Sequence, residues 1–120
     1  MHKHFSFILA LTLAVAAASC TYDNEEELYP CMPENVSYRN TIVPILENHC
    51  YDCHSDANVQ ISQVPLEGYQ NLRAKALGGQ LVFRITNTDV NLRMPQGLPK
   101  LDTCDIRKII NWVEDGAPDN

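Results

Sequence analysis

Two cysteines and a histidine lie close together in the middle of the chain, in the order Cys50-Tyr51-Asp52-Cys53-His54. Residues three apart on a helix share one face, so the Cys50 and Cys53 thiols can reach the same flat ligand. Each thiol can add to one vinyl group of a porphyrin and form a thioether, and the His54 imidazole can bind the iron as its proximal ligand. The C-x-x-C-H pattern therefore predicts one covalently attached haem c.

Two other chemistries use paired cysteines. A C-x-x-C pair can be half of a zinc site, but zinc usually takes a second pair at similar spacing, and Cys20, Cys31 and Cys104 are isolated. A thioredoxin-like pair lies in a strand-helix-strand context, and no strand pattern precedes Cys50. We expect haem attachment, with zinc binding and thiol redox chemistry as the alternatives.

The iron of a six-coordinate electron carrier takes a second axial ligand, usually Met or His. Met94 lies 40 residues after His54, in the loop 91–99 (NLRMPQGLP), where Pro and Gly disfavour a helix. His49 directly precedes Cys50 and cannot easily reach the opposite face of the ring. We expect Met94 to be the distal ligand, and the alternative is an ordinary packing residue. The other Met and His residues lie near the N-terminus: Met1, His2, His4 and Met32.

The first residues have the pattern of a secretory signal peptide. A short basic start is followed by a mostly apolar run over 5–18 and by the small residues of 16–19 (AAAS). This run is too short to span a bilayer comfortably. We therefore expect 1–19 to be a signal peptide and the rest of the chain to be extracytoplasmic.

Cys20 follows the small residues directly, which resembles the lipobox of bacterial lipoproteins, although Ala17 stands where Leu or Val is usual. We expect a lipid on Cys20 that anchors the protein to a membrane. The alternative is an ordinary signal peptide, which would leave an unpaired thiol in an oxidising compartment. Residues 20–35 read as an acidic tether. This tether resembles the acidic tract of Bacteroidota lipoproteins, some of which reach the cell surface, so we expect the periplasm, outer membrane or cell surface.

Cys31 and Cys104 remain after the lipid and haem sites are assigned. An oxidising compartment allows them to form a disulfide, which would stabilise the fold by about 4 kcal/mol in the chain-entropy model. The alternative is two separate thiols.

Charge and length bound the rest of the chain. The whole sequence has 9 basic and 15 acidic residues and a net charge of −6. Residues 36–120, the expected domain, hold ten acidic and eight basic residues, for a net charge of −2. No basic stripe is present, so we expect no nucleic-acid partner. The domain is small enough that a covalently held haem would form much of its core.

Hydrophobic periodicity predicts helices joined by loops. We expect a first helix over 42–53, capped by Thr41 and with Pro44 in its first turn. A loop over 56–65, a helix over 66–77 ended by two glycines, and a short helix over 80–86 follow. The last helix begins after Asp102 and ends at Gly116. It carries an apolar stripe of Ile106, Ile109, Ile110 and Val113, with Trp112 beside it.

Three segments in this order resemble the small mono-haem class I cytochromes c, especially planctomycete-type cytochrome c domains: TIVPILENHCYDCHS (41–55), RITNTDVNLRMPQG (84–97) and LDTCDIRKIINWVEDGAP (101–118). The resemblance covers about 36–118. It implies an all-α, haem-wrapping bundle of three to five helices with long loops, in which the first and last helices cross. It also implies that Cys50 and Cys53 bind the haem, that His54 is the proximal ligand and that Met94 is the distal ligand.

A cytochrome of this kind would be a one-electron carrier, not an enzyme. It would exchange electrons with redox partner proteins and transform no small-molecule substrate. A haem-based redox enzyme subunit or ligand sensor is the alternative, and a thiol oxidoreductase or zinc module is a more distant one.

Overall fold

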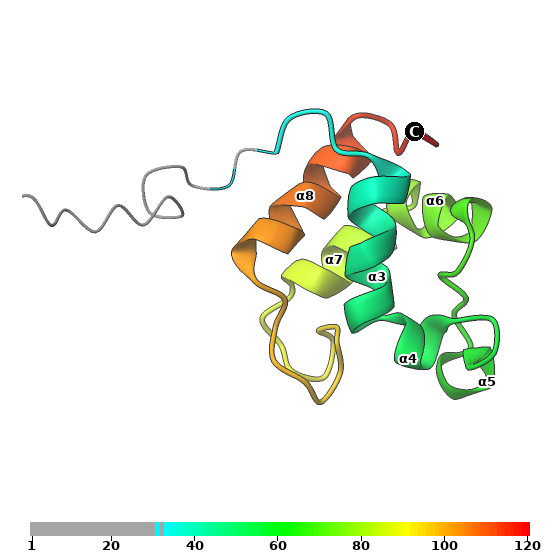
Figure 1. Ribbon diagram of the computed structural model, residues 1–120. Helices are drawn as coiled ribbons and strands as arrows, with labels where there is room; N and C mark the ends of the chain where they lie inside the picture. Colours follow the sequence, from blue (N-terminus) through cyan, green and yellow to red (C-terminus); the bar gives the residue numbers. More distant parts are fainter. Residues whose placement is uncertain (1–30, 32) are drawn as a thin grey trace, which may run out of the picture. The chain divides into compact units, whose positions relative to one another are not determined.

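The computed structural model describes Cys31 and residues 33–120, which form an all-α unit (Figure 1). Its elements, in chain order, are η2 (Tyr38–Ile42), α3 (Val43–His49), α4 (Tyr51–His54), α5 (Val59–Ser62), α6 (Tyr69–Leu77), α7 (Gln80–Thr86) and α8 (Thr103–Glu114). The described residues contain no strand. The expected signal peptide (1–19), Cys20 and most of the tether (20–30 and residue 32) lie outside the described residues.

The first helical segment begins earlier than the sequence predicts. Ser37, not Thr41, is the N-cap, because its side-chain oxygen accepts a hydrogen bond from the Asn40 backbone nitrogen at 3.2 Å. The Thr41 nitrogen already donates to the Ser37 carbonyl at 3.0 Å, so Thr41 lies inside the helical turn. Pro44 lies in the first turn of α3, as predicted, where a missing N–H costs little.

Two other boundaries differ from the prediction. The segment 56–65, expected to be a loop, contains the one-turn helix α5. The helix expected from Leu66 begins only at Tyr69, because Gly68 has φ +82° and ψ 143°, a conformation outside the helical region. With α5 and the division of the first helix at Cys50, the described residues hold six α-helices, more than the three to five expected.

The last helix follows the prediction closely. The Asp102 carboxylate accepts hydrogen bonds from the backbone nitrogens of Cys104 (2.7 Å) and Asp105 (2.9 Å), which makes it the N-cap of α8. Gly116, at φ +90°, ends the helix in the left-handed conformation that glycine adopts at low cost. On the apolar stripe, Ile109 and Trp112 are buried. The short helix expected over 80–86 is also present, as α7.

The core lies where the first helical segment and α8 pack together. Tyr38 of η2 stacks on Trp112 with ring centroids 5.8 Å apart, and Tyr69 of α6 meets Tyr38 edge-on at 5.2 Å. Figure 1 shows η2 and α3 running across α8 in the upper part of the unit. The fully buried side chains here are Ile42, Leu46, Leu72, Ile109 and Trp112.

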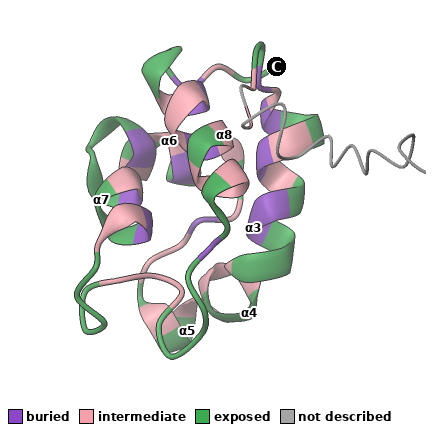
Figure 2. Cartoon of the chain, turned by 90° about the vertical axis from the view of Figure 1, so that its left-hand side faces the viewer, coloured by how far each residue is buried: buried purple, intermediate pink, exposed green. Residues whose placement is uncertain are grey.

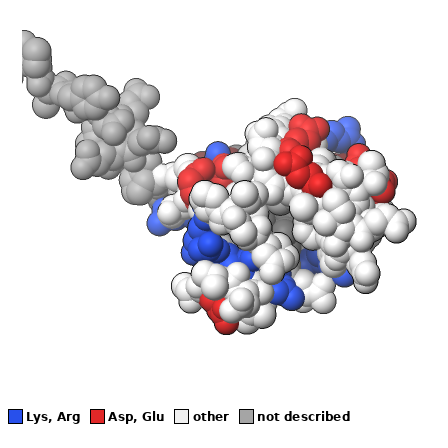
Figure 3. Space-filling view, turned by 90° about the horizontal axis from the view of Figure 1, so that it is seen from below, with Lys and Arg blue, Asp and Glu red and all other residues white. Residues whose placement is uncertain are grey.

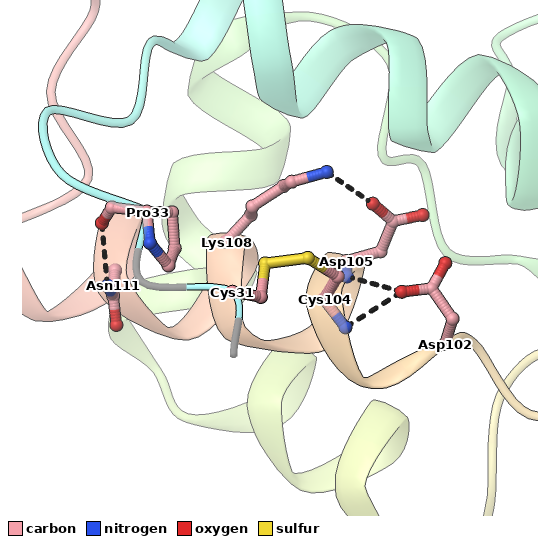
Figure 4. The surroundings of a disulfide bond; sticks show 7 residues. All are labelled: Cys31, Pro33, Asp102, Cys104, Asp105, Lys108 and Asn111. Atoms are coloured by element: carbon pink, nitrogen blue, oxygen red, sulfur yellow. Dashed lines mark hydrogen bonds and ion pairs between the residues drawn. A yellow bond between two sulfur atoms is a disulfide. The ribbon is translucent and has the colours of Figure 1, made fainter. Parts of the chain in front are cut away.

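A disulfide joins Cys31 to Cys104 in the first turn of α8 (Figure 4). The two Cα atoms are 5.4 Å apart, within the range that a disulfide spans. The segment that follows Cys31 is held along the same helix, because the Asn111 side chain donates a hydrogen bond to the Pro33 carbonyl at 2.9 Å. No helix among the described residues is long and apolar enough to cross a membrane.

Candidate haem-attachment site

Of the two cysteines in the C-x-x-C-H segment, Cys50 lies at a break in the helix and Cys53 lies in the helix that follows, α4. Cys50 has φ −126° and ψ −38°, which separates α3 from α4. Its carbonyl oxygen nevertheless accepts hydrogen bonds from the backbone nitrogens of Cys53 (3.1 Å) and His54 (2.9 Å). The three residues therefore share one tight turn. Cys50 is half-buried and Cys53 is exposed, and neither forms a disulfide.

His54 is held in a fixed orientation. Its Nδ1 lies 2.7 Å from the Val64 carbonyl oxygen, and a carbonyl can only accept, so Nδ1 carries the proton. The Leu66 nitrogen donates to the His54 carbonyl at 2.9 Å, which closes the segment 55–65 into a loop against α4. The other ring nitrogen, Nε2, then has its lone pair available. Histidines that bind metals typically donate their second ring N–H to a carbonyl in this way.

Burial determines the protonation of the residues at the start of this turn. It raises the pKa of the Cys50 thiol to about 11. It is also the main reason that the pKa of Tyr51 rises to about 12. At neutral pH the Cys50 side chain is therefore a thiol. Reactive cysteines and zinc ligands are thiolates, and their surroundings normally lower the pKa.

Met94 comes from a different segment, the long loop between α7 and α8. Its backbone nitrogen donates to the Arg84 carbonyl at 2.9 Å, which ties the loop back to α7. Its side chain is half-buried. Figures 1 and 2 both place this loop at the lower end of the unit, the end that also holds α4 and α5. The structure thus gathers Cys50, Cys53 and His54 in one turn, and the α7–α8 loop, which contains Met94, reaches the same end of the unit.

The same end exposes large apolar side chains. Neither α4 nor α5 contains a buried residue. Large hydrophobic residues that are exposed in α5, α7 and the α7–α8 loop are Ile61, Phe83, Val90, Leu92 and Leu98. Such a concentration of exposed apolar side chains is typical of a surface that another group covers.

Three cationic side chains hold the α7–α8 loop. Arg84 donates to the Leu92 carbonyl at 3.0 Å, Arg93 to the Leu98 carbonyl at 3.3 Å, and Lys100 to the Thr86 carbonyl at 3.5 Å. The ion pairs found among the described residues join other groups: Arg39 with Asp119, and Asp105 with His49 and Lys108. Figure 3, which views the unit from below, shows a hollow with Lys and Arg side chains gathered beside it.

Sequence reasoning did not identify the Val64 carbonyl or these cations as part of the site. A backbone carbonyl has no sequence signal of its own, and the charges are spread over 17 residues from Arg84 to Lys100. A weak signal was present in Arg93, which directly precedes Met94.

Other parts of the described unit offer less. A shallow depression between the segment 33–35 and α8 is lined by Asn111 and the carboxylates of Glu34, Glu114 and Asp115. No group of three or more His, Cys, Asp or Glu side chains in the described residues is arranged to hold a metal ion. That finding does not bear on haem, because the porphyrin supplies four of the iron's ligands and the protein supplies at most two.

The residues at the lower end have the properties that a covalently attached haem requires of a protein. Two unpaired cysteines lie one turn apart, a histidine keeps Nε2 available, and a methionine lies in a second segment. Exposed apolar side chains lie in α5 and in the α7–α8 loop. Comparison with protein-family models, with curated proteins and with solved structures finds no match to this chain.

Proposed function

We propose that the protein is an extracytoplasmic mono-haem c-type cytochrome that carries one electron at a time. Cys50 and Cys53 would hold the haem through thioethers, His54 Nε2 would be the proximal ligand of the iron, and Met94 would be the distal ligand. The observation that carries the proposal is the hydrogen bond between His54 Nδ1 and the Val64 carbonyl. It gives the histidine of a C-x-x-C-H segment the tautomer and the fixed ring that iron ligation needs.

The bound haem would supply an iron that alternates between Fe(III) and Fe(II). The protein's own groups would set how readily it does so. The Val64 carbonyl would make the His54 ring a better electron donor by accepting its Nδ1 proton in a hydrogen bond. The Met94 thioether, a soft ligand, would favour Fe(II) and raise the reduction potential. The exposed apolar side chains of α5 and the α7–α8 loop would exclude water from the ring.

The proposed cellular setting rests on the N-terminal sequence. Removal of 1–19 and a lipid on Cys20 would anchor the chain to a membrane, and the acidic tether 20–35 would separate the domain from it. The partners would be redox proteins that exchange electrons with the haem. We expect no substrate that the protein transforms, and no nucleic-acid partner.

The raised pKa of Cys50 makes a thiol oxidoreductase the weaker alternative, because a protonated, half-buried thiol is a poor nucleophile. A haem-based sensor or enzyme subunit uses the same attachment residues and differs at Met94. In a sensor the sixth position of the iron would be open or easily vacated. The state of Met94 therefore separates the two haem functions.

Expression in a bacterium that attaches c-type haem tests the proposal. The purified protein should be coloured, keep its haem through denaturation in acid, and show the absorption spectrum of a low-spin six-coordinate haem in both oxidation states. A colourless protein with titratable Cys50 and Cys53 thiols would refute the proposal.

Matched variants identify the ligands. His54→Ala should lose the low-spin spectrum, whereas His49→Ala should keep it, because His49 is exposed and faces Asp105 at 3.9 Å. Met94→Ala should open the sixth position, so that carbon monoxide binds the reduced variant rapidly. Rapid carbon monoxide binding to the unaltered protein would favour the sensor over the electron carrier.

A further inference from the structure

Arg93 carries a buried nitrogen without a partner. Its Nε makes no hydrogen bond within the described residues, although the same guanidinium donates to the Leu98 carbonyl through Nη2. Arginine remains charged at any pH that proteins experience, and each of its N–H groups is a donor. A buried charged donor left unsatisfied is costly, so its presence indicates a partner outside the described residues.

The charge around Arg93 indicates what that partner is. Arg84 and Lys100 donate to carbonyls of the same loop region, at Leu92 and Thr86. None of the three cations takes part in an ion pair found among the described residues. Backbone carbonyls fix these side chains without neutralising them. Arg84 on α7 and Arg93 and Lys100 in the loop therefore bring three positive charges to this region, which also contains Asp89. The exposed apolar residues of the loop are Val90, Leu92 and Leu98.

We propose that this loop binds the propionate carboxylates of the haem, and that Arg93 Nε is the buried donor to one of them. The inference rests on the proposed function, because a haem is the apolar group that also brings two carboxylates to the same place. A guanidinium suits a carboxylate because its N–H groups form a planar fork. Arg93 directly precedes Met94. The proposed carboxylate ligand and the proposed iron ligand are therefore adjacent in the chain, and a movement of the loop would shift both.

A consequence follows for the reduction potential. Fe(III) carries one more positive charge than Fe(II), and a free propionate stabilises the more positive state. The Arg93 guanidinium, half-buried and with its Nε buried, would offset that effect and raise the potential, since a fixed charge acts more strongly where water is partly excluded. Exposed Arg84 and Lys100 act in the same direction but more weakly, because solvent and salt screen them.

The test measures the midpoint potential of the haem-loaded protein at fixed pH, in low and in high salt. Arg93→Gln should lower the potential, and the shift should persist in high salt. Arg84→Gln and Lys100→Gln should give smaller shifts that shrink as salt is added. Arg73→Gln on α6 is the charge-matched control and should leave the potential unchanged. Arg93→Lys keeps the positive charge but not the planar arrangement of N–H donors. Its midpoint potential should lie between those of the unaltered protein and Arg93→Gln.

The spectra separate the possible failures. If no haem attaches, the proposed function fails and this site with it. If haem attaches, Met94 remains bound, and the potential of Arg93→Gln matches that of Arg73→Gln, the propionate site is wrong while the cytochrome stands. If Met94 no longer binds the iron in Arg93→Gln, the Arg93→Lys variant tests the propionate site instead. A shift of the propionate bands in its resonance Raman spectrum would support a contact between Arg93 and a propionate. Unchanged propionate bands would overturn the proposal.

An inorganic anion could satisfy the same cations. Adding phosphate to the unaltered protein distinguishes the two sources. A site already occupied by a propionate should show no phosphate-dependent change in potential beyond that produced by a neutral-salt control of equal ionic strength. A saturable phosphate effect that disappears in Arg93→Gln would show that the site is open to free anions and would overturn the propionate assignment.

Discussion

The two ends of the helical unit are built differently. At the upper end in Figure 1, where η2 and α8 pack together, the Tyr38 ring contacts the rings of both Trp112 and Tyr69. Polar groups there are satisfied as well: the Trp112 Nε1 donates to the Pro118 carbonyl at 3.0 Å, and Asn120 bonds the backbone of the η2 turn at Tyr38 (2.7 Å). At the lower end, α4 and α5 contain no fully buried residue, and Arg93 Nε has no hydrogen-bond partner among the described residues.

The upper end packs with its own side chains, whereas the lower end, on the proposed function, would be completed by the haem. Exposed apolar residues such as Val90 (64% exposed) and Leu98 (57%) stabilise little in the polypeptide alone, because their surface remains in water. Small domains commonly compensate for a small core with a covalent cross-link or a bound group. Here the aromatic core completes the upper end, a disulfide joins Cys31 to the first turn of α8, and the lower end has the unpaired cysteines that we propose attach haem.

The largest expected effect comes from the upper end. Trp112→Ala removes a fully buried ring from the stack with Tyr38 and should cost about 3–5 kcal/mol of unfolding free energy, measured by chemical denaturation. Trp112→Phe keeps most of the volume but removes the donor to the Pro118 carbonyl, so its cost should be smaller.

Leu98→Ala is the matched change at the lower end. In haem-free protein it should alter the unfolding free energy by less than about 0.5 kcal/mol, because the side chain is exposed. In haem-loaded protein the cost should increase. An equally small cost in the two forms would break the comparison, since it would mean that Leu98 does not pack against the haem.

The disulfide lies at the boundary between the ends, because Cys104 is in the first turn of α8, directly after the α7–α8 loop. It closes a segment with a sequence separation of 73. Replacing both Cys31 and Cys104 by Ser should cost about 4 kcal/mol in the chain-entropy model. Reduction of the unaltered protein should lower the denaturation midpoint similarly, whereas the double variant should not respond to reductant. A double variant as stable as the unaltered protein would indicate that the bond constrains little.

The sequence predicted the upper end better than the lower end, for physical reasons. The helix α8 follows from local signals: a capping aspartate at 102, an apolar stripe and a closing glycine at 116. The attachment residues also follow from a local motif. Three features of the lower end depend on how separate segments pack together: the break at Cys50, the turn α5 and the hydrogen bond to the Val64 carbonyl. The spacing of residue types along the sequence does not predict such packing. Ser37 and Thr41 are both residue types that cap helix N-termini, and in the folded protein Ser37 is the N-cap.

A modest effect, smaller than those of Trp112 and the disulfide, is expected at Asp102, the cap of α8. Hydrogen bonds from the Asp105 and Cys104 backbone nitrogens lower the pKa of the Asp102 carboxyl below its usual value of 3.8. A carboxyl with a lowered pKa in the folded state stabilises the fold above the unfolded-state pKa, and that stability is lost as pH falls through the folded-state pKa. Asp102→Ala should therefore cost about 1 kcal/mol at pH 7, measured by denaturation, and less in acid.

Asp102→Asn separates the cap from its charge. Asparagine also accepts hydrogen bonds from the first-turn nitrogens but does not titrate, so its stability at pH 7 should stay close to that of the unaltered protein. In acid it should lose less stability than the unaltered protein, because its capping oxygen cannot be protonated there. Identical acid dependence in the two proteins would mean that the Asp102 charge contributes nothing. Asp102 would then stabilise α8 only through hydrogen bonds that do not depend on its charge. Its protonation would not lower the stability of the fold in acid.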